Sequence, residues 1–119
     1  MSYDENNIFS KILKGEIPCE LIYEDDYSVA FNDINPQAKI HILLIPKGKY
    51  ISMDDFSEKA TQNELSSFFR AIGVVARKFN LDKTGYRILA NHGPDSHQEV
   101  PHFHVHILGG NSLGPLIVR

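Results

Sequence analysis

The stretch PHFHVHILGG, residues 101–110, alternates histidine with apolar residues. Because a β-strand sends successive side chains to opposite faces, His102, His104 and His106 are expected to share one face of a strand. The apolar residues between them would share the other face. The pattern therefore predicts a strand with the protein core on one side and a row of imidazoles on the other.

Length and composition are those of an ordinary globular domain. A chain of 119 residues with 42% hydrophobic and 23% charged residues can build one sizeable core, so we expect a single domain over residues 1–119. The formal net charge of -3 makes nucleic acid an unexpected partner. A nucleotide would have to be held by a local pocket rather than by a basic surface.

Targeting and cysteine signals are few. The opening MSYDENNIFS is acidic where a signal peptide would be basic, and no apolar run approaches the roughly 20 residues of a membrane span. We therefore expect a cytoplasmic protein without a membrane partner. Cys19 is the only cysteine, which excludes a disulfide within the chain and a Cys-rich zinc site.

Five segments have the composition of strands. Residues 20–33, ELIYEDDYSVAFND, contain two such runs around Asp25-Asp26 and predict a hairpin. Residues 39–46, KIHILLIP, predict a third strand with His41 on the face opposite Ile40 and Ile42. Two further strands are predicted within residues 85–93, GYRILANHG, and 102–110, HFHVHILGG.

Two helices are expected from apolar spacing and caps. Residues 7–15, NIFSKILKG, predict a short helix that begins after Asn7. Residues 61–80 predict the one long helix, because Thr61 and Glu64 match the capping box and an apolar stripe follows them. The fold class is therefore α+β, with a five-stranded, mostly antiparallel sheet, one long helix and a short N-terminal helix.

Three interpretations compete for the aligned histidines. They could be the solvated face of an edge strand, although this explains three in register poorly. They could bind a metal, since imidazole is a common ligand for zinc, iron and copper. Because His102 and His106 would lie roughly 13 Å apart along a strand, only two of the three could reach one ion, with His41 as a further ligand.

The third interpretation is an imidazole nucleophile supported by its neighbours. Neutral imidazole attacks phosphorus and acyl centres, and its conjugate acid protonates leaving groups near neutral pH. His104, in the middle of the row, would be the attacking group. Its Nε2 would carry the free lone pair if its Nδ1–H were donated to a nearby acceptor such as a backbone carbonyl.

The pattern H-x-H-x-H followed by apolar residues, here His102 to Leu108, resembles the signature of the histidine triad (HIT) superfamily. Residues 7–47, then GYRILAN at 85–91 and QEVPHFHVHILGG at 98–110, are similar to the Hint branch in order and spacing. The resemblance covers nearly the whole chain and implies a HIT-like fold over residues 1–119. It also implies a homodimer.

The Hint resemblance implies hydrolysis of the P–N bond in nucleoside 5′-phosphoramidates, such as adenosine 5′-phosphoramidate and aminoacyl-AMP conjugates, through a nucleotidyl-histidine. It implies a purine nucleotide as the partner. We expect no metal and no other cofactor, because imidazoles would supply both attack and proton transfer. Two alternatives stay open, a dinucleoside polyphosphate hydrolase of the same superfamily and a nucleotide-binding regulatory module with little catalysis.

The resemblance also assigns site residues. It makes His104 the nucleophile with His41, His102 and His106 around it, and Asp33 the acceptor of the ribose hydroxyls. The base would lie between apolar walls, and the phosphate beside polar residues of residues 91–99. The walls are Ile8, Phe9, Ile12, Phe31, Ile34 and Leu43, and the polar residues are Asn91, Gln98 and Glu99.

Two positions depart from the Hint pattern. His97 stands where many relatives have glycine, and Glu99 stands where some have a serine that meets the phosphate. Because a carboxylate repels a phosphate, we expect Glu99 to point away or to offer only its backbone N–H.

Overall fold

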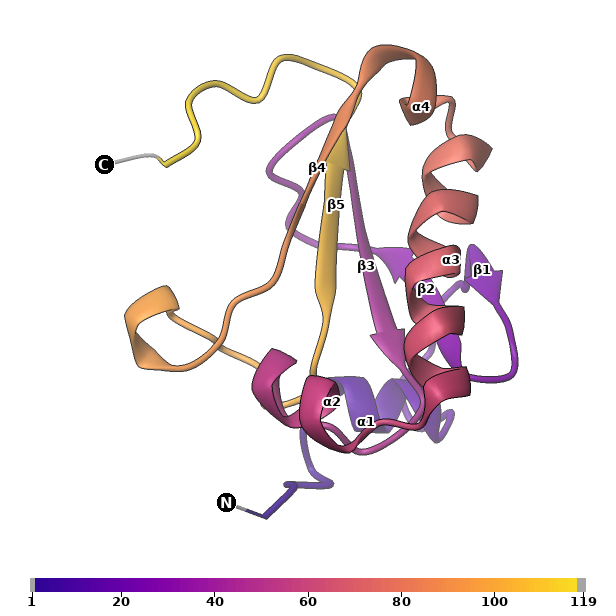
Figure 1. Ribbon diagram of the computed structural model, residues 1–119, viewed down its shortest axis with the longest axis vertical. Helices are drawn as coiled ribbons and strands as arrows, with labels where there is room; N and C mark the ends of the chain where they lie inside the picture. Colours follow the sequence, from indigo (N-terminus) through magenta and orange to yellow (C-terminus); the bar gives the residue numbers. More distant parts are fainter. Residues whose placement is uncertain (1, 118–119) are drawn as a thin grey trace.

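A five-stranded sheet in the order β1-β2-β3-β5-β4 organises the chain (Figure 1). The computed structural model describes residues 2–117. Every neighbouring pair in this sheet is antiparallel, and β3 lies at its centre between β2 and β5. The α+β prediction with five strands, one long helix and a short N-terminal helix is confirmed. The strands are β1 Tyr23–Glu24, β2 Ser28–Asn32, β3 Ile40–Pro46, β4 Tyr86–Leu89 and β5 Val105–Gly109.

The two predicted helices begin at the expected caps. In α1, Ile8–Leu13, the Asn7 side chain accepts the N–H of Ser10, and α3, Gln62–Lys78, begins with the predicted capping box. Three shorter helical segments escaped the prediction: α2 Met53–Lys59, α4 Leu81–Thr84 and the 3₁₀ turn η1 Pro94–Ser96. Among them, α2 carried a readable signal, Ser52 followed by two aspartates in the first turn.

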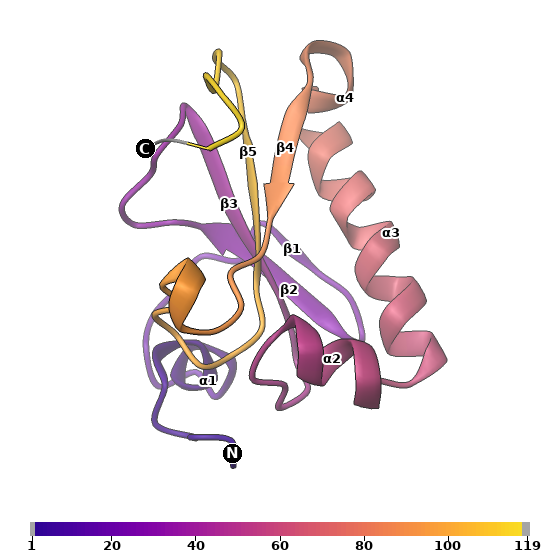
Figure 2. The same ribbon diagram turned by 60° about the vertical axis from the view of Figure 1, so that its left-hand side comes forward.

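The two faces of the sheet are covered by different helices (Figure 2). The α3 face packs Phe68, Ile72 and Val75 against the apolar residues Phe103, Val105 and Ile107 of the histidine stretch, all of them buried. The α1 face holds a second cluster, Phe9, Val29, Phe31, Leu43 and Ile45. The predicted alternation between core and histidine faces therefore holds along residues 102–107.

The paired part of β5 is shorter than the sequence suggested. We predicted a strand over residues 102–110, but pairing with β3 begins at Val105, opposite Leu44. Ahead of it, the N–H of Phe103 donates to the carbonyl of Tyr50 at 2.7 Å instead of joining the ladder. His102 and His104 therefore lie on an extended segment that is held by a loop rather than by a neighbouring strand.

The polar turn between β4 and β5 contains a strained position. His97 has φ 57° and ψ 46°, in the left-handed region that disfavours side chains with a Cβ. Glycine, the residue that the Hint resemblance predicts at this position, would adopt this conformation without that cost. Across residues 2–117, none of the helices is both long enough and apolar enough to cross a membrane.

Candidate active site

Four aromatic rings lie in contact along the α1 face of the sheet. The ring centroids of His41 and His106 are 5.1 Å apart, those of His106 and His104 are 5.1 Å apart, and those of His104 and Phe9 are 5.0 Å apart. His106 belongs to β5 and His41 to β3, whereas Phe9 comes from α1. The structure thus brings together histidines that are separated by more than 60 residues in the chain.

A hydrogen bond to the backbone two residues earlier orients the ring of His104. Its Nδ1–H donates to the carbonyl of His102 at 2.7 Å, so the neutral ring carries its lone pair on Nε2. The side chain is buried against Phe9, and burial lowers the pKa of His104 below its ordinary value. At neutral pH the ring is therefore uncharged, with its one proton on Nδ1, and Nε2 can act as a nucleophile.

A second hydrogen-bonded pair lies beside His104. The N–H of Gln37 donates to Nδ1 of His41 at 3.0 Å, which leaves the proton of neutral His41 on Nε2. That Nε2 lies 2.8 Å from Nδ1 of His106 and 3.4 Å from Oδ2 of Asp33. His41 therefore donates to His106, whose own proton is on Nε2 and can be offered to a substrate. Burial is the main cause of the lowered pKa values of both rings, about 4 for His106.

Asp33, His41 and His106 are also the one group in residues 2–117 with the composition and spacing of a metal site, their ligand atoms lying within 4.8 Å of one another. This set differs from the predicted alternative, in which two of the aligned histidines would join His41. A metal would have to replace the proton on Nε2 of His41 and push apart two nitrogens that are 2.8 Å from each other. The present geometry is that of a hydrogen-bonded chain.

His102 is bonded on both ring nitrogens. Its Nε2–H donates to the carbonyl of Pro46 at 2.8 Å, and its Nδ1 accepts from the hydroxyl of Tyr3. The side chain is 0% exposed, and burial lowers the pKa of His102 to about 4. This imidazole has no ring nitrogen left for a substrate, in contrast to those of His104 and His106.

The predicted apolar walls fall into two groups. Phe9, Phe31 and Leu43 are buried in the cluster on the α1 face, where Phe9 lies against the ring of His104, and half-buried Ile12 packs against that cluster. Ile8 is 42% exposed and Ile34 is 95% exposed, so the free protein buries neither of them fully. These two side chains are available to cover a bound molecule.

The predicted phosphate-side residues lie on the segment between β4 and β5. Asn91 is half-buried and Glu99 is exposed. The amide nitrogen of Gln98 donates to the carbonyls of Ile51 and Val100, and its amide oxygen accepts the N–H of Gly93. The Gln98 side chain is thus already used to hold this loop against the rest of the protein.

Several partners of the histidines were not predicted from the sequence. They are backbone groups of Gln37 and Pro46 and the side chain of Tyr3. For His104, the structure shows the expected donation of Nδ1–H to a backbone carbonyl, that of His102. Backbone groups leave no composition signal, and Tyr3 lies 99 residues from His102 in an acidic, featureless segment. No local pattern could have paired them.

Comparison with known proteins identifies the class. Residues 14–113 match the HIT domain family, and the chain belongs to that family. It is 54% identical, over 99% of its length and 97% of the relative's, to an uncharacterized 13.2 kDa HIT-like protein of Azospirillum brasilense. It is 40% identical to the purine nucleoside phosphoramidase of Escherichia coli K12, over 97% of this chain and 96% of that one.

A solved structure shows the same fold. A histidine triad protein from Clostridium difficile is 42% identical and superposes with a TM-score of 0.86, covering 96% of this chain and 98% of that one. The predicted resemblance to the histidine triad superfamily is confirmed.

The buried neutral histidines predict acid sensitivity above the range in which carboxylates titrate. Because the folded pKa of His102 is about 4 and that of an unfolded histidine is about 6.5, the unfolded chain binds the extra proton as the pH falls below 6.5. For His102 alone, the free energy of unfolding should drop by about 2 kcal/mol between pH 7 and pH 5. Urea denaturation at the two pH values measures this difference.

A matched pair of variants tests whether His102 causes this pH dependence of the free energy of unfolding. His102→Gln keeps an N–H for the Pro46 carbonyl but cannot be protonated, so it should shrink the pH 7 to pH 5 difference. His92→Gln, at an exposed histidine, should leave the difference as it is in the parent protein. An unchanged difference in His102→Gln would contradict the assignment.

Proposed function

We propose that this protein is a hydrolase of nucleoside 5′-phosphoramidates that works through a nucleotidyl-histidine on His104. The observation that carries the proposal is the hydrogen bond from Nδ1–H of His104 to the carbonyl of His102, which leaves Nε2 as a lone pair at neutral pH. The named activity of the E. coli relative supports the choice of substrate class. The preferred base is a purine.

The reaction has two steps. Nε2 of His104 attacks the phosphorus and an N–P bond to the enzyme forms. The substrate's P–N bond breaks as its nitrogen takes a proton from solvent and leaves as an amine, and the solvent regains that proton from the attacking water in the second step. Water then attacks the phosphorus of the nucleotidyl-histidine, which releases the nucleoside monophosphate and restores the imidazole. No oxidant, reductant or metal enters this balance.

The His41–His106 pair serves the phosphate. Because Nε2 of His106 carries a proton and its ring touches that of His104, it can donate to a non-bridging phosphate oxygen where negative charge develops. Nearby Asp33 favours the charged form of His41, so the pair can accommodate a proton during the reaction. His102 then has a supporting role rather than a chemical one.

The same geometry supports a ribose site at Asp33 and a base site between the apolar walls. Oδ1 of Asp33 accepts the N–H of Asn35 at 2.8 Å, and this orients the half-buried carboxylate beside the histidines. Its remaining lone pairs would accept the two ribose hydroxyls. The base would lie against Phe31 and Leu43, with exposed Ile34 closing over it.

A comparison of kcat/KM for three substrates distinguishes the proposed function from two alternatives. Adenosine 5′-phosphoramidate, a diadenosine polyphosphate and an acyl-adenylate would be supplied to the same preparation. The proposed activity requires the phosphoramidate to be turned over best. A preference for the diadenosine polyphosphate would indicate a dinucleoside polyphosphate hydrolase, and binding without turnover of any of the three would indicate a regulatory nucleotide-binding module.

One prediction of the proposed function concerns the covalent step. His104→Ala should lower kcat by roughly a thousandfold or more, because no neighbouring group can replace the attacking atom, while nucleotide binding persists. Acid quenching with substrate labelled in its phosphate, followed by peptide mapping, should find the label on His104. His92→Ala, at an exposed histidine, is the control and should behave as the parent protein.

The same assay separates covalent from metal-assisted attack. Treatment with EDTA should change neither the rate nor the label. A loss that zinc restores would instead assign Asp33, His41 and His106 to a metal centre. Label on any histidine other than His104 would also contradict the proposed mechanism.

A second prediction tests the base site through Ile34. This side chain is 95% exposed in the free protein, so Ile34→Ser should leave the melting temperature unchanged. If a purine covers it, KM should rise about fivefold through lost apolar contact, with kcat nearly constant. Val74→Ser, at an exposed apolar residue of α3 on the other side of the sheet, should leave KM as it was.

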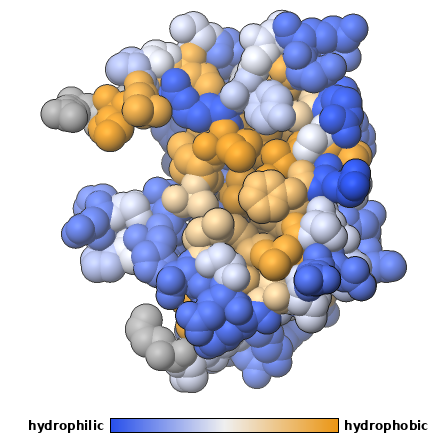
Figure 3. All heavy atoms as spheres, in the orientation of Figure 1, coloured by the Kyte–Doolittle hydropathy of each residue, from blue (hydrophilic) through white to orange (hydrophobic). Residues whose placement is uncertain are grey.

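We also propose that two copies associate through β4. In the sheet of residues 2–117 this strand is at an edge, and Ile88 and Leu89 on it are exposed. Together with Phe69, 62% exposed, and Met53 they surround an apolar hollow with a volume of about 310 Å³. Figure 3 shows this apolar area as a continuous orange patch at the centre of the view. An unpaired edge next to such a patch suits antiparallel pairing with a second copy.

The association has a direct test. Ile88→Asp would place a carboxylate in the apolar contact, so the dimer dissociation constant should increase by roughly a hundredfold. Sedimentation equilibrium measures it. Leu21→Asp, at an exposed apolar residue near the opposite edge of the sheet, should not change the association. A parent protein that sediments as a monomer, or an Ile88→Asp variant that stays dimeric, would contradict this interface.

A further inference from the structure

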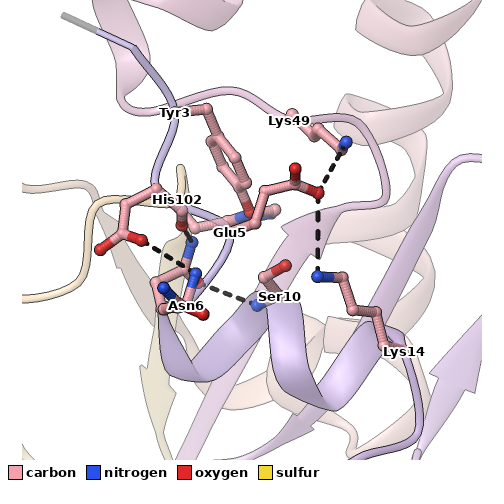
Figure 4. A network of polar contacts seen from close by, with 9 residues as sticks. Tyr3, Glu5, Asn6, Ser10, Lys14, Lys49 and His102 are labelled. Carbon is pink, nitrogen blue, oxygen red and sulfur yellow. Dashed lines mark hydrogen bonds and ion pairs between the residues drawn. The ribbon is translucent and has the colours of Figure 1, made fainter.

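The segment that precedes α1 passes beside His102 (Figure 4). It brings the ring of Tyr3 edge-on to that of His102, with centroids 5.5 Å apart. The Tyr3 hydroxyl donates to Nδ1 of His102, because the Nε2 proton of that ring is already given to the Pro46 carbonyl. A half-buried tyrosine thus supplies the only donor within residues 2–117 that the structure places on this buried nitrogen.

The segment is fixed independently of Tyr3. Asn7 is buried; its side-chain oxygen accepts the N–H of Ser10 at 2.8 Å, and its side-chain nitrogen donates to the carbonyl of Asp4 at 2.7 Å. Glu5 lies 2.8 Å from Nζ of Lys49 and 3.7 Å from Nζ of Lys14, as Figure 4 shows. Residues 3–7 are therefore a short anchored arm rather than a loose end, and Tyr3 reaches His102 from a defined position.

A further hydrogen bond joins His102 to His104, the proposed nucleophile. The backbone carbonyl of His102 accepts Nδ1–H of His104, and the orientation of this carbonyl depends on how the His102 residue is held. Three contacts hold it: Tyr3 on one ring nitrogen, Pro46 on the other, and the adjacent Phe103 N–H on the Tyr50 carbonyl. The series Tyr3, His102, His104 thus links the arm to the attacking imidazole.

We propose that Tyr3 is a positioning residue for the nucleophile: its hydroxyl fixes the His102 ring, and with it the carbonyl that sets the tautomer of His104. The inference rests on the proposed function for its kinetic consequence, but not for its structural one. Removing the hydroxyl leaves a buried acceptor without a donor, so the His102 ring gains freedom to rotate. His104 then spends part of its time with the proton on Nε2, where it cannot attack.

The kinetic test is Tyr3→Phe, which removes one oxygen and keeps the ring. We expect kcat for adenosine 5′-phosphoramidate to fall about five- to tenfold with KM unchanged within about twofold, since the Tyr3 hydroxyl is bonded to His102 and acts on the substrate only through it. Tyr27→Phe, in the turn between β1 and β2, is the matched control and should have the parent kcat.

A spectroscopic test does not depend on turnover. In protein labelled with ¹⁵N in histidine, long-range ¹H–¹⁵N spectra report which ring nitrogen is protonated. The parent should show His102 with the proton on Nε2 and His104 with it on Nδ1. In Tyr3→Phe the unprotonated nitrogen of His102 should shift as it loses its donor, and the Nδ1–H of His104 should exchange faster with solvent.

The outcomes separate this inference from the proposed function. If Tyr3→Phe leaves the His104 signals and kcat as in the parent, the inference is wrong. It is also wrong if the variant only melts at a lower temperature while both readouts persist, because Tyr3 would then be structural. If the parent protein does not hydrolyse phosphoramidates, the proposed function fails, and the His104 tautomer and exchange rate alone decide the inference.

Discussion

The candidate site depends on one hydrogen bond, from Nδ1–H of His104 to the carbonyl of His102. A neutral imidazole has one proton for two nitrogens, so holding it on Nδ1 makes Nε2 a lone pair. The acceptor is two residues away in the same chain, and its direction is a property of the backbone path. The contacts that fix this backbone, which include the hydrogen bonds to the Pro46 and Tyr50 carbonyls, therefore influence the reactivity of Nε2 of His104.

The backbone path is possible because residues 102–104 are not part of the sheet. A central strand donates its amide groups to its neighbours, which fixes them in the ladder. Here the ladder begins only at Val105, and the preceding residues use their polar groups on the loop after β3. The side chains still alternate, so Phe103 enters the core beneath α3 while His102 and His104 face α1. The sheet provides rigidity up to the edge of the site and leaves the site's own backbone free to accept hydrogen bonds.

This division explains what the sequence could and could not predict. Alternation in residues 102–107 and the capping box at Thr61 are local patterns, and both the sheet and α3 follow from them. The contact between His41 and His106 could have been predicted from the sequence, because β3 was predicted to place His41 away from the core. The contact between Tyr3 and His102 could not have been predicted, since it joins residues 99 apart through a side chain in a segment with no pattern. Backbone acceptors carry no signal at all, because every residue has one.

The three histidines of the motif differ in chemical properties because their ring nitrogens have different hydrogen-bond partners. His102 is hydrogen-bonded through both ring nitrogens, so neither is open to substrate. His104 donates a hydrogen bond to a carbonyl from Nδ1 and keeps a lone pair on Nε2. His106 accepts a hydrogen bond from His41 on Nδ1 and keeps its own proton on Nε2. Burial lowers the pKa of each, and a charge on any one disfavours a charge on the next. Hydrogen bonding, rather than charge, is therefore what distinguishes the rings. A repeat of one residue type can thus build an asymmetric site, provided that the fold surrounds each copy differently.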